Sequence, residues 1–124
     1  MALSAYIRKR QRSLGYAWQG LRVFWKTEPH ARVHAMATVI AIAAGCWFHL
    51  NKNEWKWLLI AIFLVWITEI LNTAIEKLAD IVSPGYSIAV KQVKDMAAAA
   101  VLLSAVFAVV TGLIIFLPKI ISGS

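Results

Sequence analysis

The chain has 124 residues, 60% of them hydrophobic, and a net charge of +7 at neutral pH. That length suits a single domain, and so high an apolar fraction in so short a chain indicates a membrane protein rather than a soluble one. The single cysteine, Cys46, excludes an internal disulfide.

Residues 4–26, "SAYIRKRQRSLGYAWQGLRVFWK", are too charged to cross a membrane. Apolar side chains recur in this segment at helical spacings, with basic residues between them: Tyr6, Leu14, Trp18, Leu21 and Trp25. This pattern predicts an amphipathic helix that lies on the membrane surface. Gly15 and Gly20 argue against one unbroken helix, because glycine weakens a helix interior.

Three membrane spans are predicted, over residues of about 31–50, 55–81 and 88–118. The longest uncharged run, from Met96 to Pro118, is long enough to cross a ~30 Å hydrocarbon layer at ~1.5 Å per residue. Residues 51–57, "NKNEWKW", are predicted to form a short external turn with interfacial tryptophans. The breaker "VSPGYS", residues 82–87, ends the second long helix.

The basic residues are distributed unevenly around these spans. Ten lie before the first span or between the second and third: Arg8, Lys9, Arg10, Arg12, Arg22, Lys26, Arg32, Lys77, Lys91 and Lys94. Lys52, Lys56 and Lys119 lie on the opposite side. This bias predicts a multi-pass membrane protein with a cytoplasmic N-terminus, and it explains the basic charge without nucleic acid. The membrane is the bacterial cytoplasmic (inner) membrane if the family resemblance described below holds.

The second span carries polar residues that form a stripe on one helix face. Glu69, Asn72, Glu76 and Asp80 are spaced i, i+3, i+7 and i+11. Asn72 could instead form an interhelical hydrogen bond, and Asp80 could cap the helix or reach the interface. Glu69 lies about a turn or more inside the span, where an ionisable side chain usually marks function. Because three helices offer little interior to hide such groups, we expect a homo-oligomer.

More charged groups are expected on the same cytoplasmic side. Glu28 precedes the first span, and Lys94 and Asp95 begin the third. Carboxylates with phosphate oxygens are the ligands that Mg²⁺ prefers, and lysine neutralises phosphate. The pattern therefore suits phosphoryl transfer at a membrane–water boundary, with one carboxylate receiving the acceptor's proton. No Walker-type or glycine-rich phosphate loop occurs, so any ATP site must be built from side chains on membrane helices.

Three segments, "GYAWQGL", "EILNTAIEKLAD" and "KDMAAAAVLL", resemble in order and spacing the small prokaryotic diacylglycerol kinases of the membrane and the related undecaprenol kinases. The similarity extends from about Ile7 to Leu117. It implies an all-α homotrimer of three-span subunits with active sites between protomers. It also implies transfer of the γ-phosphate of MgATP to a lipid alcohol, either diacylglycerol, giving phosphatidic acid, or undecaprenol.

The resemblance assigns roles to individual residues. Glu69 matches the catalytic base, and Glu28 and Glu76 match carboxylates that bind Mg²⁺. Positions that engage ATP or shape its site are Lys9, Tyr16, Glu28, Asn72, Glu76, Asp80, Tyr86, Lys94 and Asp95. Positions near the lipid acceptor are Trp18, Arg32, Glu69 and Ala98.

The chain departs from the family pattern at a few positions. An aromatic–histidine pair is common where this chain has Tyr86 and Ser87. Gram-negative diacylglycerol kinases have a carboxylate at the position of His34 and a serine at that of Ala98, so these residues are closer to the undecaprenol kinases. For His34 the sequence favours an interfacial histidine that is hydrogen-bonded within the bundle over a catalytic one.

Two non-enzymatic interpretations remain open from the sequence. A small proton-coupled transporter would use Glu69 as its proton-binding group, but it leaves Lys94, Asp95 and Glu76 without a role. A basic scaffold on the membrane surface accounts for residues 4–26 and not for the carboxylates within a span.

Overall fold

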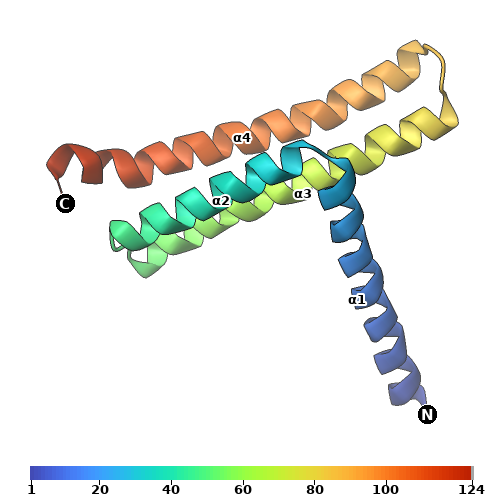
Figure 1. Cartoon of the computed structure of the whole chain (residues 1–124), viewed down its shortest axis with the longest axis horizontal. Coiled ribbons are helices and arrows are strands. Elements are labelled where there is room, and N and C mark those ends of the chain that lie inside the picture. Colours follow the sequence, from blue (N-terminus) through green and yellow to red (C-terminus); the bar gives the residue numbers. More distant parts are fainter. Residues whose placement is uncertain (124) are drawn as a thin grey trace. The chain divides into compact units, whose positions relative to one another are not determined.

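The computed structural model describes residues 1–123, which form four helices and no strand: α1 (Ala2–Thr27), α2 (His30–Trp47), α3 (Lys52–Val82) and α4 (Ile88–Ser122) (Figure 1). The predicted all-α class is confirmed. The chain divides into two compact units, Met1–Val33 and the part from His34 onward, and each is described by itself.

The first unit consists mainly of α1, which runs without a break through Gly15 and Gly20. A Cβ atom added at either glycine would meet nothing within 4 Å, so neither marks a close approach. The helix predicted over residues 4–26 is therefore present, and the two glycines do not interrupt it. The helix ends before Glu28, whose backbone is extended at φ −104° and ψ 111°. A residue that precedes a proline, here Pro29, is driven out of the helical region by the proline ring.

In the second unit, α2 ends at Trp47 rather than at the expected residue 50. The backbone N–H of Leu50 donates to the Gly45 carbonyl at 3.2 Å, and that of His49 to the Cys46 carbonyl at 3.3 Å. These two bonds form a Schellman motif, with His49 in the left-handed region at φ 52°. Leu50 is buried in a cluster with Leu58 and Ile115.

The next helix begins earlier than the sequence suggested. The Asn51 side chain accepts from the Glu54 backbone N–H at 2.8 Å, and the Glu54 carboxylate accepts from the Asn51 backbone N–H at 3.0 Å. This reciprocal capping box starts α3 at Lys52. The prediction of a turn over residues 51–57 was therefore wrong, and Trp55 and Trp57 lie in the first turns of α3.

Within the second unit, α3 and α4 pack closely against each other, and α2 lies beside α3 (Figure 1). The Ser104 hydroxyl of α4 donates to Thr68 Oγ1 of α3 at 2.9 Å. Leu50, Leu58 and Ile115 form a small buried cluster toward the other end of the bundle. Side-chain hydroxyls are common links between helices in membranes, where a polar group has no water to bond.

Two of the three expected spans are supported by length and composition. Within residues 1–123, α3 and α4 are long and apolar enough to cross a membrane, and α2 is not among such helices. Only 17% of the most apolar window of each is buried. Most of their surface is therefore available to lipid or to other protein.

The last helix extends past the expected end at residue 118 and continues to Ser122, with Pro118 inside it. Gly123 then adopts a left-handed conformation at φ 72°, and its N–H donates to the Lys119 carbonyl. Lys119 Nζ lies 3.3 Å from Glu54 Oε2, which joins the end of α4 to the start of α3.

Gly45 provides a test of the contact between α2 and α3. A Cβ atom built there would lie 2.6 Å from Cη2 of Trp55, whereas at Gly112 it would meet nothing within 4 Å. We expect Gly45→Ala to destabilise the protein relative to Gly112→Ala by about 1–3 kcal/mol, the usual cost of overpacking. Both changes gain the same helix propensity, so the difference reports the contact.

The measurement is thermal unfolding of both variants in the same detergent, followed by circular dichroism. Gly45→Ala combined with Trp55→Phe should recover part of the loss, since the smaller ring leaves room for the methyl group. Equal melting temperatures for the two alanine variants would show that the Trp55 side chain can move aside without loss of stability.

Candidate active site

Glu69 of α3 lies opposite His34 of α2. Its Oε1 atom is 3.1 Å from His34 Nε2, within hydrogen-bond distance. The two side chains are 15% and 21% exposed. His34 thus contacts α3 within this unit, and its partner is the carboxylate that the sequence singled out as the base.

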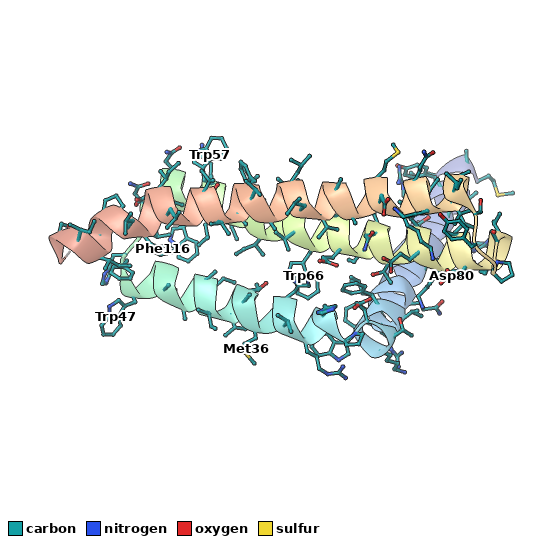
Figure 2. All side chains as sticks on the ribbon, turned by 90° about the horizontal axis from the view of Figure 1, so that it is seen from above. Met36, Trp47, Trp57, Trp66, Asp80 and Phe116 are labelled. Carbon is teal, nitrogen blue, oxygen red and sulfur yellow. The ribbon has the colours of Figure 1, made fainter. Side chains whose placement is uncertain are left out.

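Two further side chains place this part of α2 against α3. The Thr38 hydroxyl donates to the His34 carbonyl at 2.7 Å, and the Trp66 indole N–H donates to Thr38 Oγ1 at 2.8 Å. The Trp66 ring also lies 6.2 Å from the imidazole, centroid to centroid. In Figure 2, Trp66 lies between the two helices, whereas Met36 points away from the bundle.

An apolar groove of about 200 Å³ runs along α2, α3 and α4, with His34 among its lining residues. Small side chains make room for it on all three helices: Ala37, Ala41, Ala61, Ala108 and Gly112. Phe116 lines the groove as well (Figure 2). The groove therefore reaches His34, the partner of Glu69, and its walls suit hydrocarbon.

One turn beyond Glu69, the amide of Asn72 donates to Glu76 Oε1 at 3.4 Å. The amide oxygen, Asn72 Oδ1, is buried and has no hydrogen-bond partner among residues 1–123. A buried acceptor without a partner is rare and costly. Asn72 and Glu76 together thus offer oxygen atoms to a donor or a cation.

The last turn of α3 pairs with α4 instead of α2. Lys94 Nζ lies 2.6 Å from Asp80 Oδ1, with 38% of the lysine and 67% of the aspartate side chain exposed. On α4, Lys91 pairs with Asp95 at 2.7 Å across one helical turn. The predicted nucleotide residues Asp80, Lys94 and Asp95 therefore belong to two exposed ion pairs.

The connection between α3 and α4 includes the position at which the family pattern changes. Ser87 is the N-cap of α4, and its hydroxyl accepts from the Val90 backbone N–H at 3.4 Å. Tyr86 is exposed, as is Ala98 on α4. The serine thus has a local structural role, since serine is among the preferred N-cap residues.

The remaining predicted residues belong to the first unit. Glu28 is half-buried at the end of α1, and its carboxylate accepts from the His30 backbone N–H at 3.3 Å. The Arg32 guanidinium lies over the Trp25 ring at 5.2 Å, a cation–π geometry. Lys9, Tyr16 and Trp18 are exposed along α1. Because Glu28 and Glu76 lie in different units, their joint role in metal binding stays a prediction.

Sequence reasoning missed two contacts of this region. His34 was not expected to meet Glu69, and no local spacing could have indicated it because the residues lie on different helices. Lys91 was left out of the site, although its i, i+4 spacing to Asp95 is visible in the sequence. Within residues 1–123, no group of three or more His, Cys, Asp or Glu side chains is arranged to hold a metal.

Comparison with known proteins identifies the family. The family described as prokaryotic diacylglycerol kinase matches residues 15–116. The diacylglycerol kinase of Escherichia coli K12 is 36% identical over 100 residues, which cover 81% of this chain and 82% of that protein. The diacylglycerol kinase of Synechocystis is 38% identical over 111 residues, covering 89% of this chain and 63% of the relative.

The undecaprenol kinase of Bacillus subtilis is 34% identical over 109 residues, which cover 88% of this chain and 89% of that protein. These similarities extend over the two apolar helices and the polar stripe of α3. Of the interpretations drawn from the sequence, they support the enzyme rather than the transporter or the scaffold. The chain belongs to the prokaryotic diacylglycerol kinase family and is a lipid kinase.

Proposed function

We propose that this kinase transfers the γ-phosphate of MgATP to the hydroxyl of diacylglycerol, giving phosphatidic acid. The observation that supports it most is the position of Glu69. This carboxylate is largely covered within an apolar helix, and its partner His34 lines an apolar groove. An ionisable group kept in such surroundings is costly and is usually functional.

In the proposed step, the acceptor hydroxyl gives its proton to the Glu69 carboxylate. The hydroxyl oxygen forms a bond to the γ-phosphorus, and the bond from that phosphorus to the bridging oxygen breaks, releasing ADP. A positioned general base of this kind commonly contributes about 10²–10⁴-fold to the rate. Glu69 suits the role because the lipid can reach it from the hydrocarbon side.

The Asn72–Glu76 pair fits a magnesium ion. Mg²⁺ is usually held by one or two carboxylates together with substrate phosphates and waters, and not by an all-protein cage. Glu76 supplies a carboxylate, and the buried, unpartnered Asn72 Oδ1 supplies a further oxygen. When bound, Mg²⁺ would neutralise charge on the phosphates. Glu28 is the second carboxylate that we propose for this ion.

The nucleotide end of the site is proposed to include Lys94 and Asp80. An exposed ion pair contributes only about 0–1 kcal/mol, so Lys94 can exchange Asp80 for a phosphate oxygen at little cost. From the resemblance we also assign Lys9, Tyr16, Tyr86 and Asp95 to this end. Trp18, Arg32 and Ala98 are proposed to contact the acceptor.

We further propose that the active enzyme is a homotrimer, which would cover part of the exposed surface of α3 and α4.

Undecaprenol is the alternative acceptor. The relatives include an undecaprenol kinase at an identity close to those of the diacylglycerol kinases, and His34 and Ala98 resemble that branch. The groove walls are compatible with either hydrocarbon.

Phosphorylation assays with radiolabelled ATP, offering diacylglycerol and undecaprenol side by side, decide the acceptor. We expect kcat/KM to be higher for diacylglycerol. A higher value for undecaprenol would replace diacylglycerol in the proposal, and no transfer to either would refute it.

Replacing Glu69 by glutamine should abolish turnover, because the amide cannot accept the hydroxyl proton. We expect kcat to fall by about 10²–10⁴-fold, with the melting temperature in detergent little changed. Glu54→Gln is the matched control, since glutamine also satisfies a capping box and Glu54 lies at the other end of α3. Full activity of the Glu69 variant would refute its role as the base.

Replacing Glu76 by glutamine should raise the Mg²⁺ concentration needed for half-maximal activity. Loss of a metal-site partner typically costs about 10–100-fold in metal affinity, and we expect a shift of that size. The control is Lys77→Gln, an adjacent and exposed change on the same helix. An unchanged Mg²⁺ dependence in the Glu76 variant would remove Glu76 from the metal site.

A further inference from the structure

His34 is the residue whose position the proposed reaction does not yet use. Its Nε2 atom lies 3.1 Å from Glu69 Oε1, and both side chains are mostly covered. A carboxylate has two oxygens, so this contact engages Oε1 and leaves Oε2 available.

The histidine is itself fixed relative to α3. Its carbonyl accepts from the Thr38 hydroxyl, and Thr38 Oγ1 accepts from the Trp66 indole N–H. Trp66 lies one helical turn before Glu69 on the same helix, so the chain of contacts leaves α3, passes through α2 and returns to α3. These contacts hold the backbone of His34 against α3, and the contact from Nε2 to Glu69 then fixes the imidazole itself.

The consequence for Glu69 is a restricted carboxylate. A glutamate side chain has several rotatable bonds, and holding it in one rotamer costs conformational entropy. If His34 already bonds Oε1 before the acceptor arrives, the entropy cost of fixing the Glu69 rotamer is not added to the activation free energy. Misplacement of a reacting group by about 1 Å can cost about 10²-fold in rate.

We propose that His34 is a positioning residue for Glu69: it donates its Nε2 proton to Oε1, so that Oε2 faces the acceptor hydroxyl. This inference rests on the proposed role of Glu69. The hydroxyl proton goes to Oε2 while His34 keeps its own proton throughout, and the bonds at phosphorus change as described above. His34 also lines the apolar groove, so the acceptor meets the oriented carboxylate where the groove ends.

Two substitutions separate orientation from packing. His34→Gln keeps an N–H donor at a similar distance from the backbone, whereas His34→Leu keeps apolar volume and removes the donor. We expect His34→Leu to lower kcat by about 10–100-fold with the KM for ATP unchanged. His34→Gln should recover most of kcat.

His49→Asn serves as the control for loss of an imidazole, because His49 lies just beyond the far end of α2. Asparagine tolerates the left-handed conformation that His49 adopts, so activity should stay unchanged. Wild-type kcat in His34→Leu would overturn the proposal, and so would a His34→Gln variant as impaired as His34→Leu.

A measurement that does not depend on activity distinguishes this inference from the function it rests on. Melting temperatures are compared for His34→Leu, Glu69→Ala and the double variant, because alanine, unlike glutamine, removes the acceptor oxygen at position 69. The double variant should lose less than the sum of the two single losses, because each single change already breaks the same contact. Additive losses would show that His34 and Glu69 do not interact, and they would overturn this inference even if the protein is an active kinase. Non-additive losses together with a fully active Glu69→Gln variant would refute only the role of Glu69 as the base.

Discussion

The constraint on which this structure depends is that polar groups within a membrane helix find their partners in protein. Between Thr68 and Glu76, α3 places two carboxylates, an amide and two hydroxyls on a helix that is otherwise long and apolar enough to span. The hydrocarbon region holds no water that could form hydrogen bonds with these groups, so each unpaired group costs several kcal/mol. The neighbouring helices supply what is missing: His34 from α2 and Ser104 from α4.

Along the polar stripe of α3, from Glu69 to Asp80, the helix that contacts the stripe changes from α2 to α4. The surroundings change from apolar to exposed. Glu69 meets α2 beside an apolar groove, and Asp80 meets α4 in an exposed ion pair. At ~1.5 Å per residue these positions are about 16 Å apart along the helix. Between them, Glu76 accepts from the Asn72 amide, and the buried Asn72 Oδ1 has no partner among residues 1–123. A single helix face thus passes from hydrocarbon to water, which is the separation that a lipid and a nucleotide require.

The two ends of the bundle differ in how completely their helix ends are capped and their polar groups paired. At the α2–α3 turn, a Schellman motif and a capping box follow one another, Gly45 admits Trp55, and Lys119 pairs with Glu54. At the other end, a buried acceptor is left without a partner and the ion pairs are exposed. At the α2–α3 turn, local sequence preferences and tertiary contacts favour the same structure, so this end is expected to be rigid. Polar groups that lack a partner, as at the other end, are expected where a functional site is located.

From the sequence alone, the helical class, the polar stripe and the family could be inferred, because hydrophobic periodicity, residue spacing and motif order are local properties. The spacing of Glu69, Asn72, Glu76 and Asp80 required only that residues 52–82 form one helix, which they do. Helix ends were less accurate: the turn over residues 51–57 is replaced by a capping box whose residues could have been recognised in the sequence. Only the tertiary structure paired Glu69 with His34 and Asp80 with Lys94, since such contacts depend on how separate helices pack and no spacing along the chain encodes them.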